Sequence, residues 1–149
     1  MARAVIVSFF FAVAAAAASE RSAIPESLDA ALAALEELLP DADKAVFKST
    51  DEAHAVRSQH FGIGRWIRSE WRLSNESALA RHFFALGVEH PDDMSGIILR
   101  SFWRRLNGRP LEVEAQASCY QRWWQEYARL KKDAQSRGAM SYSPPDFEC

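Results

Sequence analysis

The sequence predicts an all-α protein, a single compact domain of about five or six helices. Apolar residues recur at spacings of three and four along most of the chain, which is the period of a helix with one buried face. Alternation with period two, which is typical of half-buried strands, hardly occurs. Residues that end helices separate the periodic segments. The length of 149 residues suits one domain and is short for two.

The first segment, residues 1–18, is predicted to be a secretory signal peptide. Arg3 precedes a stretch without charge that ends at Ala18, and small residues close this stretch. An uncleaved anchor is the alternative, although a membrane span needs about 20 apolar residues. The rest of the chain then divides into a helical domain over residues 19–138 and an extended tail over 139–149. We expect a secreted or periplasmic protein whose mature form has no integral membrane span.

The first helix is predicted to begin after Ser27, which can cap it, and to end before Pro40. Its leucines fall on one stripe, at positions 28, 32, 35, 38 and 39. A second, weaker helix is expected over residues 41–57. Ser74 or Asn75 is expected to cap a later helix that ends before Gly87, where a helix end favours a left-handed residue.

Tryptophan and arginine are mixed in "HFGIGRWIRSEWRL", residues 60–73, which is predicted to be helical, with Phe61 on its apolar face. This composition is typical of binding hot spots. It is equally typical of an amphipathic helix whose arginine stems cover aromatic rings. The binding candidates from this segment are Arg65, Trp66, Arg68 and Trp71.

The phrase His90-Pro91-Asp92-Asp93 precedes an apolar run that ends at Asn107-Gly108. Proline suits the first helical position, and carboxylates are favoured in the first turn. We therefore interpret the phrase as a helix start. One aspartate is expected to accept from free backbone N–H groups, and the other to pair with Arg68 or Arg65. Gly96 is predicted to allow close approach of another helix. The candidate binding residues here are His90, Asp92, Asp93 and Ser95.

An enzymatic alternative uses the same residues. A cell-envelope hydrolase would need Ser95 as nucleophile, His90 as base and Asp93 or Asp92 behind it. The glycine-flanked elbow of one large hydrolase class is absent from the sequence. His54, His60 and His82 form no ligand pair of recognised spacing with their neighbours, so neither a metal nor a cofactor is predicted.

The longest helix is expected over residues 112–136, with a buried seam at Val113, Ala117, Tyr120, Trp124 and Tyr127. Its segment "RWWQEYARLKK" is basic and aromatic, a composition also found at membrane surfaces, and Trp123 is the candidate exposed anchor. Cys119 and the terminal Cys149 are expected to form a disulfide if the protein is exported. The alternative is a buried Cys119 and a free or intermolecular Cys149.

Four stretches resemble a small bacterial domain family of unknown function. They are "IPESLDAALAALEELLP", "HFGIGRWIRSEWRL", "GVEHPDDMSGIILRSFWRRLNGRPL" and "YQRWW". The family carries phrases like HFGLGxWIRNxWxLW, HPDDMSGIIL and LNGKPI, and the resemblance extends from about Ile24 to Trp124. The chain departs from the pattern at Ser69-Glu70 and at "RLSNES". The family has no established activity, so the resemblance implies domain boundaries and a bacterial source, and no catalytic residue or ligand.

These observations lead to two hypotheses on function. The first is a non-enzymatic exported module that binds a protein or an envelope component, with an immunity or inhibitor protein as a special case. The second is the envelope hydrolase described above. The net charge of -2 argues against a nucleic-acid partner, since such proteins are usually basic.

Overall fold

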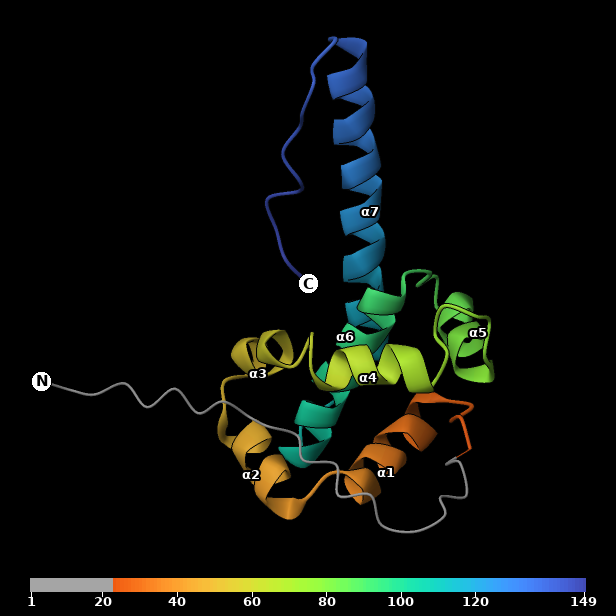
Figure 1. Ribbon diagram of the computed structural model, residues 1–149. Helices are drawn as coiled ribbons and strands as arrows, with labels where there is room; N and C mark the ends of the chain where they lie inside the picture. The colour runs from red at the N-terminus through yellow and green to blue at the C-terminus, as the bar shows by residue number, and fades with distance from the viewer. Residues whose placement is uncertain (1–22) are drawn as a thin grey trace, which may run out of the picture.

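Seven helices and no strand make up residues 23–149, which are the residues that the computed structural model describes (Figure 1). The predicted all-α fold is confirmed, with seven helices in place of five or six. The predicted signal peptide, residues 1–18, lies outside the described residues. Within the described part of the chain, no helix is both long enough and apolar enough to cross a membrane.

The extra helix comes from a break in the segment that was predicted as one helix over residues 41–57. Helix α2 (Asp41–Ser49) ends because Thr50 is extended, with ψ of 148°. Helix α3 (Glu52–Ser58) then begins, since the side chain of Asp51 accepts a hydrogen bond from the backbone N–H of His54. Asp51 is thus an N-cap inside a continuous apolar pattern.

Three further helices pack on the central helix of the fold, which spans Pro91–Leu106. Helix α1 (Leu28–Leu38) begins at Ser27, whose side chain accepts from the backbone of Ala30, as predicted. Helix α4 (Ile63–Glu70) follows Gly62. Helix α5 (Ala78–Ala85) is capped by Ser77, so the expected caps Ser74 and Asn75 were wrong by two or three residues. The physical reason is that residues 71–76 form turns before α5 starts.

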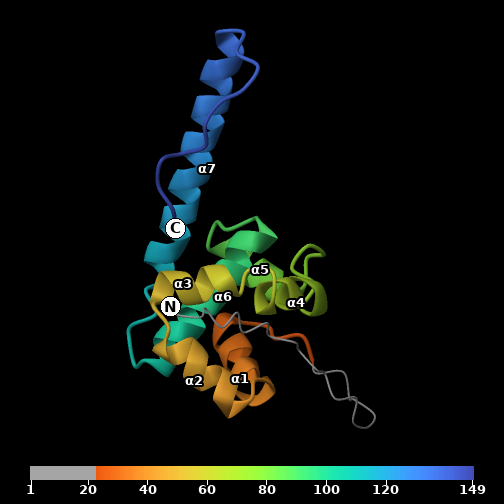
Figure 2. The ribbon, with the colours of Figure 1, turned by 60° about the vertical axis from the view of Figure 1, so that its left-hand side comes forward.

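Helix α6 (Pro91–Leu106) is the centre of the fold and contacts each of the other six helices (Figure 2). The predicted apolar face is buried: Met94, Ile97, Ile98 and Phe102 have no exposed surface. Such a helix, wrapped on most sides, positions the residues at its first turn against several neighbours at once.

Helix α7 (Val113–Ser136) packs on α6 only with its first part and then projects away from the other helices (Figure 1). The tail after Ser136 turns back and runs beside the projecting part, and both views show this (Figures 1 and 2). A disulfide between Cys119 and Cys149 closes this hairpin, with the two Cα atoms 5.7 Å apart, which confirms the predicted bridge.

The predicted buried seam of α7 is only partly correct. Ala117 is buried against the core, whereas Trp124 and Tyr127 are half-buried. The seam leaves the core because α7 projects beyond α6. In this projecting part, residues of the tail pack against α7 where the core does not reach. Tyr142 of the tail packs edge-on against Tyr127, with ring centroids 5.3 Å apart.

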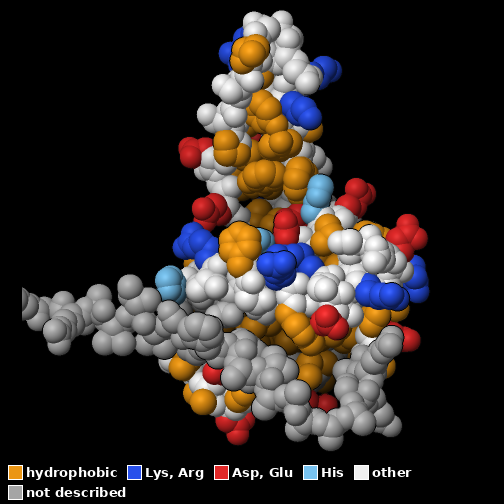
Figure 3. Space-filling view, in the orientation of Figure 1, with side chains coloured by type: hydrophobic (Ala, Val, Ile, Leu, Met, Phe, Trp, Pro, Cys, Tyr) orange, Lys and Arg blue, Asp and Glu red, His pale blue; other side chains and the backbone are white. Residues whose placement is uncertain are grey.

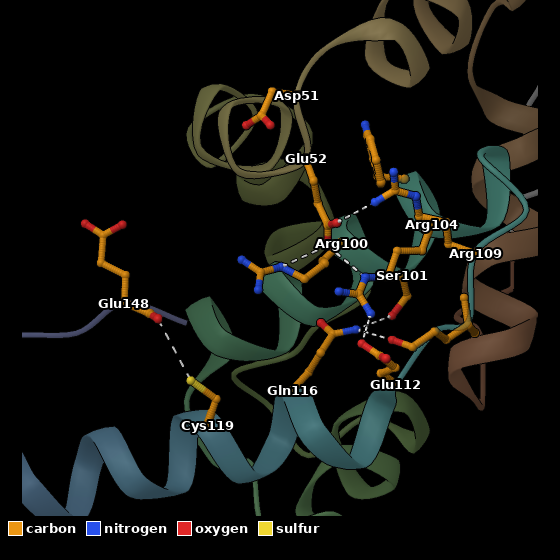
Figure 4. A network of polar contacts seen from close by, with 12 residues as sticks. Asp51, Glu52, Arg100, Ser101, Arg104, Arg109, Glu112, Gln116, Cys119 and Glu148 are labelled. Atoms are coloured by element: carbon orange, nitrogen blue, oxygen red, sulfur yellow. Dashed lines mark hydrogen bonds and ion pairs between the residues drawn. The ribbon is translucent and has the colours of Figure 1, made fainter.

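Polar contacts hold the base of α7 to α6 and α3 (Figure 4). The buried side chain of Gln116 donates to Ser101 Oγ at 3.2 Å and to a backbone carbonyl at 2.7 Å. Arg104 joins Glu52 of α3, at 2.8 Å, to Glu112 immediately before α7. These bonds fix the direction in which α7 projects.

Candidate binding surface at the start of α6

The candidate site surrounds the first turn of α6. Pro91 is the first residue of the helix, as predicted, and His90 is the N-cap without a side-chain capping bond. The expectation that one aspartate accepts from the free first-turn N–H groups was wrong. Asp92 bonds an arginine and Asp93 bonds an indole, because side-chain donors from α4 and α7 reach them.

The α4 side of the site is organised by Arg68. Its guanidinium lies 2.9 Å from the carboxylate of Asp92, and it donates to Ser95 Oγ at 2.8 Å and to the carbonyl of His60 at 3.2 Å. Of the two arginines considered from the sequence, Arg68 is the partner. Its side chain is largely buried, whereas that of Asp92 is 64 % exposed, so solvent weakens the ion pair.

Ser95 is fully engaged within the fold. Its side chain is 1 % exposed, its hydroxyl donates to the carbonyl of Asp92 at 2.9 Å, and it accepts from Arg68. A nucleophilic serine instead needs its proton directed at a base. The proposed base, His90, stacks on Trp124 of α7.

The α7 side of the site is organised by Trp124. The ring of His90 stacks on the indole with centroids 3.6 Å apart, and the indole N–H donates to Asp93 Oδ2 at 2.7 Å. Burial raises the pKa of Asp93, while the indole hydrogen bond and nearby His90 act in the opposite direction. A half-buried carboxylate with one donor retains accepting capacity toward a ligand.

A cavity of about 190 Å³ opens between the start of α6 and α7, next to this contact. Its lining comes from Gly87, Val88, Glu89, His90, Asp93, Tyr120, Gln121, Trp124 and Gln125. Burial, followed by the charge of Asp93, raises the pKa of Tyr120, so its hydroxyl stays protonated. The cavity therefore offers a carboxylate acceptor and a phenol donor among aromatic rings.

The tryptophan–arginine segment divides between core and surface. Trp71 is a core residue at 2 % exposure, and Trp66 packs edge-on against it while remaining exposed. Arg65 is exposed. Phe61, expected on the apolar face, instead lies in the turn before α4 with 82 % of its surface exposed, because the helix begins only at Ile63.

The sequence did not identify Trp124, Tyr120 and Gln121 as site residues. Trp124 fits the apolar period of its helix. That period does not indicate that its indole bonds Asp93, which lies 31 residues earlier in the sequence. Gln121, whose side chain donates to the carbonyl of Leu86 at 2.7 Å, has no distinguishing sequence context. Among residues 23–149, no cluster of three or more His, Cys, Asp or Glu side chains could hold a metal ion.

These features define an all-helical domain whose central helix begins beneath a set of aromatic and charged side chains. The chain matches the family described as Domain of unknown function (DUF6794) over residues 24–106, and it belongs to this family. The match ends with α6, short of the limit near Trp124 suggested by the resemblance, so α7 and the tail lie beyond it. No curated protein and no solved structure shows significant similarity to the chain.

Proposed function

We propose that the protein is an exported, non-enzymatic module that binds a protein or an envelope component. The binding surface is formed by Phe61, Arg65 and Trp66, together with the ion pair of Arg68 and Asp92; we call it the aromatic–arginine surface. The observation that carries the proposal is the exposure of Phe61, which is 82 % accessible and contacts His60, whose Nε2 lies 3.9 Å from Asp92 Oδ1.

The composition of this surface supports a protein ligand. Large aromatic side chains and arginine dominate the energetics of protein interfaces. Phe61 touches the ring of His60 edge-on and is otherwise open, and Trp66 is 41 % exposed. An immunity or inhibitor protein remains the special case in which the partner is another protein's active site.

Export is supported by the disulfide, since such bonds persist mainly in oxidising compartments. The charge-free segment before Ala18 is consistent with a signal peptide. These two features support our proposal of a mature protein in the periplasm or outside the cell.

The hydrolase alternative is less well supported by the geometry. Its nucleophile, Ser95, is buried and gives its proton to a backbone carbonyl. Its base, His90, is held against Trp124. A fluorophosphonate reagent tests this directly: specific labelling of Ser95 would favour the enzyme and contradict the binding module.

The binding proposal is tested by capture from the envelope fraction of the cells that make the protein. Phe61→Ser should weaken capture of the partner about thirtyfold, the effect of losing a hot-spot residue worth about 2 kcal/mol. Phe84→Ser is the control, since Phe84 is a phenylalanine on α5 that is 38 % exposed and is not part of the aromatic–arginine surface. Equal melting temperatures would show that both variants fold. Unchanged capture by Phe61→Ser would refute the proposal.

A further inference from the structure

The projecting hairpin, meaning Arg122–Ser136 of α7 and the tail that runs beside it, is basic in an acidic protein. Residues 122–140 contain five basic and two acidic side chains, a net charge of +3, and the rest of the tail adds Asp146 and Glu148, so the side chains of the whole hairpin have a net charge of +1. Residues 23–48, at the other end of the fold, carry six acidic and two basic side chains, a net charge of -4. The charges of the protein are therefore separated along its length.

The basic side chains include a stripe along α7. Arg122, Arg129 and Lys132 are separated by seven and three residues, so they lie on one face of the helix. All three are exposed. Arg129 pairs with Glu126 at 2.6 Å, whereas Arg122 and Lys132 form no ion pair with any residue in the range 23–149. The face therefore keeps an excess of positive charge.

Apolar groups lie beside this stripe. The ring of Phe147, on the tail, is 39 % exposed and lines a groove of about 560 Å³ with Arg122, Gln125, Glu126 and Arg129. Met140, where the hairpin turns, is fully exposed. Hydrophobic side chains also gather along the projection in Figure 3. The tail is held in register by the disulfide and by the ion pair of Glu148 with Arg57, at 2.8 Å.

We propose that this face of the hairpin, formed by Arg122, Arg129, Lys132 and Phe147, binds the surface of an anionic phospholipid membrane, with Met140 exposed where the hairpin turns. Exposed cations attract the negative lipid surface, and long basic side chains keep their charge in the headgroup layer while apolar neighbours enter it. A lipid surface is favoured over a protein partner because Arg122 and Lys132 are exposed and form no ion pair among residues 23–149, while Phe147 and Met140 add only a small exposed apolar surface. This inference does not depend on the proposed function, since the aromatic–arginine surface lies elsewhere.

The test is co-sedimentation of the disulfide-bonded protein with vesicles of phosphatidylglycerol and phosphatidylcholine in equal amounts. Arg122→Gln/Lys132→Gln removes two cations and should lower the partition coefficient about thirtyfold. Phe147→Ser should lower it about fivefold by removing apolar contact. Raising the salt concentration should release the protein, because surface charges are screened.

Lys48→Gln/Arg72→Gln is the matched control, since it removes two exposed cations from other parts of the fold and should leave binding unchanged. Three results would overturn the proposal. One is no binding to anionic vesicles, and another is equal binding to vesicles of phosphatidylcholine alone. The third is a dimer in sedimentation velocity that Arg122→Gln/Lys132→Gln abolishes, which would make the face a contact between copies of this chain.

Discussion

The approach of α7 to α6 at Gly96 allows a sharp test of the structure. A Cβ added at position 96 would lie 2.6 Å from the hydroxyl oxygen of Tyr120, closer than such atoms come in proteins, and 3.6 Å from the Cζ atom behind it. Alanine gains about 1 kcal/mol over glycine inside a helix, whereas overpacking costs about 1–3 kcal/mol. We therefore expect Gly96→Ala to lower the free energy of unfolding by about 1 kcal/mol.

Removing the hydroxyl should reverse the sign of this effect. In the Tyr120→Phe background the atom nearest to the added Cβ is Cζ of residue 120, at the ordinary contact distance of 3.6 Å. Gly96→Ala should therefore raise the free energy of unfolding by about 1 kcal/mol there. Urea denaturation of the four proteins, with the disulfide intact, gives a coupling energy of about 2 kcal/mol. If Gly96→Ala stabilises the protein in both backgrounds, the hydroxyl of Tyr120 does not lie over Gly96.

Four other predictions concern the site and the hairpin. Trp124→Phe removes the indole donor, so it should raise the pKa of Asp93 further and cost about 1–2 kcal/mol of stability, measured by carboxyl-carbon NMR titration and urea denaturation. Because burial already raises the folded-state pKa of Asp93 above its unfolded value, ionisation of this group opposes folding. The wild type should therefore become more stable as the pH falls through that pKa, and Asp93→Asn should lack this gain. The same pH-dependent gain in the variant would contradict the prediction. Asp92→Ala should cost less than about 1 kcal/mol, because the carboxylate that pairs with Arg68 is mostly exposed, and a larger loss on thermal unfolding would show a buried pair. Cys149→Ser opens a loop with a sequence separation of 30 residues and should cost up to about 3.5 kcal/mol in the chain-entropy model, with rapid proteolysis of the tail as the local measurement.

The parts of the fold that local rules decide could be predicted from the sequence. The stripe of α1 and the Ser27 cap follow from residues three or four apart. The same holds for α6, whose proline, apolar period and terminal glycine all agree. The break between α2 and α3 at Asp51 was not predicted from the sequence. The apolar pattern continues from Phe47 to Val56 across this break, because the N-cap changes the backbone conformation without changing the spacing of the apolar residues.

The sequence supplied candidate residues at the start of α6, and it did not supply the side chains that contact them. His90, Asp92 and Asp93 were identified because proline and carboxylates at a helix start have a known physical reason. The bond from Trp124 to Asp93 depends on how α7 crosses α6, which no local pattern encodes. Phe61 was placed on the wrong side because the helical period was extended two residues before α4 begins.

The continuity of α7 has a geometric consequence. The helix has 24 residues, which corresponds to a length of about 36 Å, and Gln116 anchors its base while the disulfide fixes the returning tail. Such an element acts as a stiff spacer of set length. A partner held at Phe61 and a surface held at Met140 would be kept at a nearly constant separation, and shortening α7 by two turns would bring them closer by about 11 Å.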